Sequence, residues 1–316
     1  MYYLGIDLGG MSIKAGVCDD EGNILTKDTC PTVRTEDGDR IISDMAELCL
    51  KVISDAGLTV EDIEYAGIAS PGSADCERGI IIYASTLPFL NYPIAKTLMD
   101  KTGLKKVYVE NDANAAAKGE ATYGAAKGYK NSLFITIGTG VGGGIIIDGK
   151  VYSGFNFSGA ELGHMVIVKD GIYCPCGRNG CMESYASATA LIRMTKEKMM
   201  SDKNSAMWAV CEGDIEKVNG KTVFDAMLQN DASAKEVYNE YIGYLACGIV
   251  NFINIFQPEV LSIGGGISKQ GEILLAPIRE IVEREQYSRH SDKKTVLKIA
   301  ALGNDAGIIG AASLGK

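Results

Sequence analysis

One pattern occurs twice along the 316 residues and restricts the fold more than any other feature. A short apolar strand leads into a glycine turn, a second strand, a polar turn and a third strand, over residues 2–27 and again over 133–153. The turns Leu8-Gly9-Gly10 and Gly138-Thr139-Gly140 take equivalent places in the two copies. We expect two related α/β lobes that face each other across a cleft, because each copy opens a lobe in the same way. The backbone N–H groups of two such turns can hold a polyphosphate between them.

The rest of the chain alternates between strand and helix patterns. Apolar residues recur at helical spacing from Ile41 to Ile53, and an alanine-rich stretch favours a helix after residue 112. Helices are expected at 39–56, 92–102, 113–126, 187–200, 232–256, 271–286 and 307–314, and further strands at 65–69, 107–109, 259–263 and 296–302. Such alternation is typical of an α/β fold.

The second glycine turn resembles two common nucleotide-binding motifs but fits neither. Gly138-x-Gly140-x-x-Gly143 matches the dinucleotide fingerprint, yet a strand at 145–147 follows where the fingerprint requires a helix. Residues 144–150 approach a Walker A loop, but Val151 stands where that loop has Ser or Thr. The sequence contains no His-Arg-Asp or Asp-Phe-Gly signature, which excludes a protein kinase. The remaining functional interpretation of this turn is that its backbone contacts phosphate. The alternative is that the glycines only form a tight hairpin.

A cluster of soft ligands lies near the middle of the chain. It contains three of the nine cysteines and one of the two histidines: His164, Cys174, Cys176 and Cys181. Thiolates and a neutral imidazole suit a tetrahedral zinc site, and a site filled by four protein ligands is structural. The alternative is buried or disulfide-bonded cysteines. Glu161 and Glu183 flank the cluster without being needed as ligands, so we expect the zinc to hold them in place for another task.

A polar run, Glu110-Asn111-Asp112-Ala113-Asn114, ends the strand expected at 107–109 and precedes the alanine-rich helix. One interpretation is that the run only caps the helix, since Asn and Asp prefer the N-cap position. The other is catalytic, because open α/β sheets place ligands where strands end. A kinase needs one carboxylate to accept the proton of the attacking hydroxyl, and Asp112 could be that group.

The composition excludes several classes of function. The net charge is −9 and no basic run is present, which disfavours nucleic acid as a partner. Six further cysteines are scattered without pairing rhythm, as in proteins of a reducing cytoplasm. No secretion signal and no apolar run of membrane-spanning length are apparent, so we expect a cytoplasmic protein without a membrane partner.

These motifs together resemble the ROK family of sugar kinases nearly end to end. The cysteine block is the most specific of them, whereas the N-terminal glycine turn is shared with the wider sugar kinase, Hsp70 and actin superfamily. The segments that carry the resemblance are 6–10 with Lys14, Ser70-Pro71-Gly72, 110–114, 138–144, 159–164, 174–183, 264–266 and 303–307.

The resemblance implies a two-lobed, actin-like, ribonuclease H-like α/β fold with a cleft between the lobes. The smaller lobe would comprise 1–113 with 304–316, and the larger one 114–303 with the zinc loop. It implies ATP-dependent phosphorylation of a hexose, with glucose as the expected acceptor, ATP and Mg²⁺ as cofactors, and a structural Zn²⁺ on the four ligands named above. A homodimer or higher homo-oligomer is expected.

The resemblance also implies individual roles. Asp112 would be the general base, and one ring nitrogen of His164 would bind zinc while the other contacts sugar. The implied sugar contacts are Gly72, Asn111, Asp112, Glu161, His164 and Glu183. The implied nucleotide contacts are Asp7, Gly9, Gly10, Lys14, Thr139, Gly140 and Gly265.

Two departures and several alternatives stay open. Met11 replaces the usual Thr or Ser after the first glycine pair, and the loop 86–91 differs from the family's Asn-Leu-Pro-aromatic pattern.

The acceptor could instead be N-acetylmannosamine, allose or fructose, or the protein could be a sugar sensor without catalysis. A DNA-binding repressor of the family needs a helix-turn-helix domain, for which a strand at residue 2 leaves no room.

Overall fold

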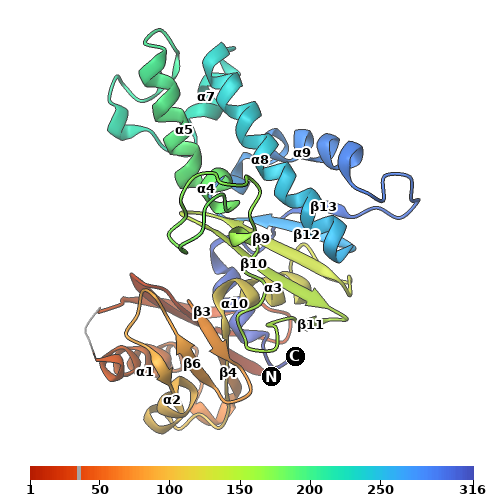
Figure 1. Cartoon of the computed structure of the whole chain (residues 1–316). Coiled ribbons are helices and arrows are strands. Elements are labelled where there is room, and N and C mark those ends of the chain that lie inside the picture. Colours follow the sequence, from red (N-terminus) through yellow and green to blue (C-terminus); the bar gives the residue numbers. More distant parts are fainter. Residues whose placement is uncertain (34–36) are drawn as a thin grey trace. The chain divides into compact units, whose positions relative to one another are not determined.

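The computed structural model describes residues 1–33 and 37–316 (Figure 1). The chain divides into two compact units. The first consists of Met1–Phe134, Gly144–Ala160 and Ala301–Lys316, and the second of Ile135–Gly143 and Glu161–Ala300. The lobe boundaries expected from the sequence, 1–113 with 304–316 and 114–303, differ from this division and stay a prediction.

The first unit contains a five-stranded sheet in the order β3-β2-β1-β4-β8. Its first three strands form an antiparallel meander around the first glycine turn, and the last two run parallel to β1. The strands are β1 (Tyr2–Leu8), β2 (Ser12–Cys18), β3 (Ile24–Pro31), β4 (Ile63–Ser70) and β8 (Val107–Asn111).

A second five-stranded sheet repeats this order as β11-β10-β9-β12-β13. Its strands are β9 (Ser132–Ile137), β10 (Val141–Ile147), β11 (Lys150–Val151), β12 (Val260–Gly264) and β13 (Val296–Ile299). As in the first sheet, the hairpin partners are antiparallel and the last two strands are parallel. The duplicated strand pattern predicted from the sequence is therefore confirmed at the level of topology.

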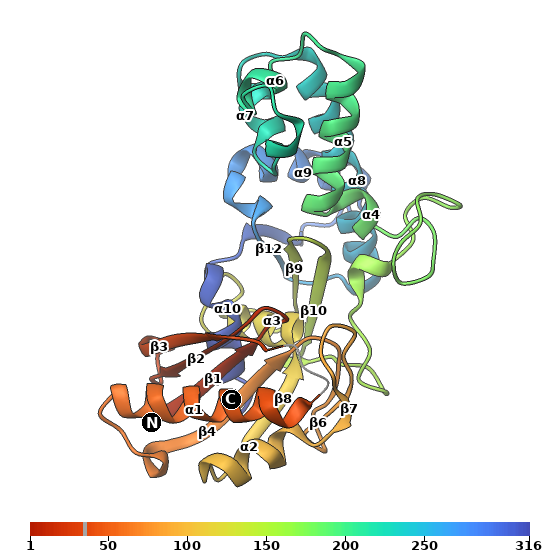
Figure 2. The ribbon, with the colours of Figure 1, turned by 90° about the vertical axis from the view of Figure 1, so that its left-hand side faces the viewer.

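Helices cover both faces of the first sheet (Figure 2). Helices α1 (Gly38–Asp55) and α2 (Ile94–Thr102) pack on one face, where Leu4, Ile6 and Leu8 of β1 enter the main core. Helices α3 (Asp112–Thr122) and α10 (Ala306–Ala312) cover the other face, where Tyr3 packs with Ile308. Successive side chains of β1 thus point to opposite faces of the sheet, and both faces are buried.

Apart from its strands, the second unit consists mainly of helices. The long helix α8 (Ala232–Phe256) contacts α5 (Ala188–Ser201), α7 (Thr222–Leu228) and α9 (Glu272–Glu285). The side chain of Asp231 caps α8 by accepting from the Ala234 N–H. Among residues 1–33 and 37–316, no helix is both long and apolar enough to cross a membrane.

Two local expectations were wrong or incomplete. The alanine-rich helix was expected to reach 126, but α3 ends at Thr122 because the buried Glu120 carboxylate accepts from the Ala125 N–H at 2.7 Å and turns the chain. A three-stranded sheet that lies between β4 and α2 along the chain was not predicted from the sequence. It consists of β5 (Ser73–Asp75), β6 (Ile80–Tyr83) and β7 (Leu90–Tyr92).

Backbone-to-backbone contact brings α10 onto the first sheet. A Cβ atom at Gly5 would lie 1.9 Å from Ile308 O, and one at Gly67 would lie 1.9 Å from Ala311 O. Side chains at these two positions would therefore overlap the helix backbone. The close layer spacing in this part of the core depends on glycine at both places.

We expect Gly67→Ala to destabilise the first unit by about 1–3 kcal/mol or more, because the added methyl group overpacks the sheet against α10. The matched control is Gly243→Ala on the exposed face of α8, where a Cβ meets nothing within 4 Å. That change should be neutral or stabilise by up to about 1 kcal/mol. Urea unfolding of both variants measures the difference, and equal midpoints would contradict the packing described here.

Candidate active site and metal site

The polar run after β8 forms the start of α3. Asn111 is the N-cap residue: its Oδ1 accepts from the N–H groups of Ala113 at 2.9 Å and Asn114 at 3.2 Å. Asp112 is the first residue of the helix and is exposed, and its Oδ1 accepts from the Ala113 N–H at 2.8 Å. Asn111 is therefore the N-cap residue of α3, and Asp112 is a second acceptor for the same Ala113 N–H.

The Gly72 turn lies against Asn111. The side-chain amide of Asn111 donates to the Gly72 carbonyl at 3.1 Å. Gly72 has φ +90°, and a Cβ there would lie 2.1 Å from Tyr83 O. Only glycine fits this backbone, so the structure brings the implied sugar contacts Gly72, Asn111 and Asp112 together within the first unit.

Glu110 is a site residue that the sequence interpretation missed. Its side chain is only 5% exposed, and its carboxylate accepts hydrogen bonds from the Asn111 N–H, Asn114 Nδ2 and Ser153 Oγ. Burial raises the pKa of Glu110, while these three donors oppose the shift. The sequence did contain a signal for it, because Glu110 is a carboxylate in a strand whose preceding residues are Val and Tyr.

The first glycine turn carries an ion pair beside it. Lys14 Nζ lies 3.0 Å from Asp7 Oδ2, and the two residues face each other across β1 and β2. The turn is closed by the Gly9 N–H, which donates to Ser12 O at 2.9 Å. Met11, next to this turn, is 82% exposed. The turn therefore presents a thioether where the family usually has the hydroxyl of Thr or Ser.

The second glycine turn packs against the end of β12 and against Glu183. Gly265 has φ +84°, and a Cβ there would lie 2.3 Å from Ile137 O, at the end of β9. The Val141 N–H donates to Glu183 Oε2 at 2.9 Å. At Gly140 a Cβ would lie 2.2 Å from the same oxygen, so this glycine leaves room for the carboxylate.

The four soft ligands converge in the second unit. One ligand atom from each of His164, Cys174, Cys176 and Cys181 lies within 4.8 Å of all the others. His164 Nδ1 is 3.6 Å from Cys174 Sγ, and Cys176 Sγ is 3.6 Å from Cys181 Sγ. A tetrahedral zinc with its usual bond lengths separates nitrogen and sulfur by about 3.6 Å and two sulfurs by about 3.8 Å. The donor set and its spacing therefore fit zinc.

The disulfide alternative is wrong. Sulfur atoms joined in a disulfide lie about 2.05 Å apart, whereas the Cys176 and Cys181 sulfurs are 3.6 Å apart. All nine cysteines are free thiols. A hydrogen bond from the Arg178 backbone lowers the pKa of Cys176, which favours the thiolate form that a metal requires.

The two flanking carboxylates stand close to the cluster. Glu161 Oε2 lies 4.0 Å from His164 Nε2, and Glu183 Oε1 lies 3.9 Å from Cys174 Sγ. The imidazole therefore presents Nδ1 to the cysteines and Nε2 to Glu161. This arrangement leaves Nε2 able to serve a second partner while Nδ1 binds a metal.

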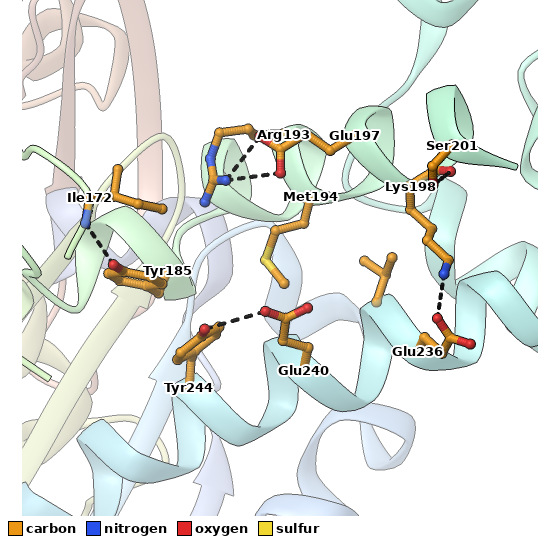
Figure 3. Close-up of a pocket in the computed structure, with 11 residues that line it drawn as sticks. Ile172, Tyr185, Arg193, Met194, Glu197, Lys198, Ser201, Glu236, Glu240 and Tyr244 are labelled. Atoms are coloured by element: carbon orange, nitrogen blue, oxygen red, sulfur yellow. Dashed lines mark hydrogen bonds and ion pairs between the residues drawn. The ribbon is translucent and has the colours of Figure 1, made fainter. Parts of the chain in front are cut away.

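A separate pocket of about 360 Å³ lies between α5 and α8 (Figure 3). Arg193 is paired with Glu197 and Lys198 with Glu236, and a third carboxylate, Glu240, accepts from Tyr244 Oη. It is lined by none of the sugar, nucleotide or metal ligands expected from the sequence. We therefore do not assign the substrate to it.

Comparison with known proteins identifies relatives along nearly the whole chain. The chain is 40% identical over 313 residues to a glucokinase of Thermotoga maritima, which covers 98% of this chain and 96% of that one. A solved structure of a ROK family glucokinase from Streptomyces griseus, in complex with glucose and AMPPNP, has 34% identity and a TM-score of 0.83, with 99% of each chain covered. A xylose repressor of Caldicellulosiruptor bescii is 28% identical over 286 residues, which cover 90% of this chain and 70% of the repressor.

The sequence profile of the ROK family matches residues 3–316. The similarity to the Streptomyces griseus glucokinase confirms the actin-like α/β fold that the family resemblance implies. Family and fold agree with the duplicated sheet order and with the cluster of one histidine and three cysteines. The chain belongs to the ROK family.

Proposed function

We propose that the protein transfers the γ-phosphoryl group of ATP to a hexose, with glucose as the preferred acceptor. The observation that carries the proposal is the 40% identity, over nearly the full length of both chains, to a glucokinase. The site geometry supports it, because Asn111 is the N-cap residue of α3 and Asp112, the first residue of the helix, is exposed. The proposed setting is the cytoplasm, and the proposed assembly is a homodimer or higher homo-oligomer.

Asp112 is the proposed general base. A sugar hydroxyl is far too weak an acid to ionise alone near neutral pH. In this mechanism the carboxylate of Asp112 accepts the proton of the sugar 6-hydroxyl as that oxygen attacks the γ-phosphorus, and the bond from the γ-phosphorus to the β,γ-bridging oxygen breaks, so that ADP leaves. Positioning of the reactants and neutralisation of charge supply the rest of the rate acceleration, and Mg²⁺ bound with ATP contributes charge neutralisation.

The nucleotide and sugar contacts are proposed as follows. The backbone N–H groups of the two glycine turns suit phosphate oxygens. ATP would be contacted by Asp7, Gly9, Gly10, Lys14, Thr139, Gly140 and Gly265. The sugar hydroxyls would be contacted by Gly72, Asn111, Glu161, His164 and Glu183, and carboxylate and amide groups suit a ring of free hydroxyls.

A structural zinc is proposed on His164, Cys174, Cys176 and Cys181. Its task would be to hold Glu161 and Glu183, which stand 4.0 Å from His164 Nε2 and 3.9 Å from Cys174 Sγ. A site with four protein ligands has no open position for water, so the zinc would not take part in phosphoryl transfer.

Asp112→Asn tests the catalytic assignment. Asparagine keeps the size and most hydrogen bonds of the side chain but cannot accept the proton, so kcat should fall by about 10²–10⁴. Sugar affinity and the melting temperature should change much less, because Asn111 still caps α3. A coupled ADP-release assay measures kcat, and a value near that of the wild type would refute Asp112 as the base.

Cys181→Ala tests the zinc. We expect loss of bound metal together with weaker sugar binding, because the loop that carries Glu161 and Glu183 loosens. Cys211→Ala is the matched control: Cys211 is also buried in the second unit, but its Sγ contacts only Trp208 O among the contacts described for it. Elemental analysis and sugar titration give the two readouts. Wild-type protein that is fully active without zinc would end the proposal.

A panel of sugars tests the acceptor. A buried polar group left unpaired costs about 1–3 kcal/mol, so each mismatched hydroxyl should lower kcat/KM about tenfold or more. We expect glucose to exceed N-acetylmannosamine, allose and fructose by at least that factor. Equal values for glucose and N-acetylmannosamine would show that the acceptor is wrong, and no turnover of any sugar would favour a sugar sensor.

A further inference from the structure

We infer that Glu110 is a positioning residue for phosphoryl transfer. Its buried carboxylate fixes the Asn111-Asp112 pair with one oxygen and the segment 153–159, called here the 153–159 loop, with the other. The inference rests on the proposed function, since Glu110 acts through Asp112 and touches neither substrate nor reacting atoms.

The first oxygen acts on both sides of Asp112. Oε1 accepts from the Asn111 N–H at 2.9 Å and from Asn114 Nδ2 at 3.1 Å. These partners precede and follow Asp112 at the junction of β8 and α3. Holding both neighbours fixes the backbone from which the Asp112 carboxylate projects, and a base displaced by about 1 Å loses much of its effect.

The second oxygen holds the 153–159 loop. Ser153 Oγ donates to Glu110 Oε2 at 2.9 Å, and Ser153 O accepts from the Gly159 N–H at 2.8 Å, so Glu110 binds the point where the loop closes. Further along, Ser158 Oγ lies 2.8 Å from Ser73 Oγ, next to the Gly72 turn. One carboxylate therefore connects the proposed base with a loop that is hydrogen-bonded to Ser73, the neighbour of the proposed sugar contact Gly72.

The arrangement costs stability. Glu110 is 5% exposed and its three donors are neutral groups, so the carboxylate is desolvated without a compensating charge among these partners. Asn114 Oδ1 is also buried without a hydrogen-bond partner among the described residues. Burial of the charge on Glu110 and of the unpaired oxygen of Asn114 both lower the stability of the folded state. Stability alone does not explain these residues, and breaches of this kind concentrate at functional sites.

The chain offers a matched control in Glu120, at the other end of α3. Glu120 is also fully buried, and its carboxylate accepts from the backbone N–H groups of Ala125, Ala301 and Leu302. Its environment is thus comparable, but its partners are remote in the chain from Asp112. Glu120→Ala should lower the melting temperature while kcat per folded enzyme stays within about threefold of the wild type.

The test compares Glu110→Ala with Glu110→Gln. Removal of the side chain should lower kcat about 10²-fold in enzyme that is folded, because the base is no longer held. The glutamine amide can accept the two bonds of Oε1 and donate to Ser153 Oγ, so Glu110→Gln should stay within about threefold of the wild type. If Glu110→Gln falls as far as Glu110→Ala at an unchanged melting temperature, the charge itself is required and the positioning role is wrong.

A double variant tests whether Glu110 acts through Asp112. In an Asp112→Asn background, Glu110→Ala should lower kcat by less than about threefold, because no base is left to position. A further 10²-fold loss would overturn the inference. Full activity of Asp112→Asn would overturn the proposed base and this inference together. A low Asp112→Asn activity with a wild-type Glu110→Ala activity would overturn this inference alone.

Ser153→Ala keeps the inference testable if Glu110→Ala does not fold. The change removes one hydroxyl from a half-buried position and releases the 153–159 loop from Oε2. The KM for sugar should rise about tenfold, in line with the loss of one hydrogen bond to a charged group, while kcat changes little. An unchanged KM would refute the link between Glu110 and the loop.

Discussion

Close contact between the backbones of α10 and the first sheet determines much of the first unit. It requires glycine at positions 5 and 67, where any side chain would overlap the helix. Helix α10 meets α3 just as closely, since a Cβ at Gly310 would lie 2.1 Å from Ala115 O. The sheet, α10 and α3 are thus packed closely together, and the position of α3 in turn determines where Asp112 lies.

Two buried carboxylates fix the ends of α3. Glu110 precedes the helix and binds donors around its first turn, whereas Glu120 lies in its last turn and binds the chain that enters the C-terminal segment. Each accepts only from neutral donors among the partners described here. Movement of either end of α3 would break several buried hydrogen bonds, and of these only the bonds of Glu110 lie beside Asp112.

Sequence patterns predicted the parts of this protein that depend on local chemistry. The repeated glycine turns predicted the duplicated sheets, and the cluster of histidine and cysteines predicted a ligand set that the structure brings together. The parts that were missed depend on tertiary contacts. Glu120, whose bond to the Ala125 N–H ends α3, also accepts from the Leu302 N–H, 182 residues along the chain, and the role of Glu110 depends on Ser153, which is 43 residues away. Neither of these distant partners can be identified from local spacing.

The placement of α10 also affects how the chain folds as it is synthesised. The hydrogen bond from Tyr65 Oη to Ala312 O joins residues 247 positions apart. At ribosomal rates of about 5–20 residues per second, β1 and β4 would wait about 10–50 s for the helix that covers them. During that interval Tyr3 and Tyr65 remain without their cover, and chaperones that bind aromatic surface have time to act. The first strands to be made are thus among the last to be enclosed, which makes this sheet face the vulnerable surface of the nascent chain.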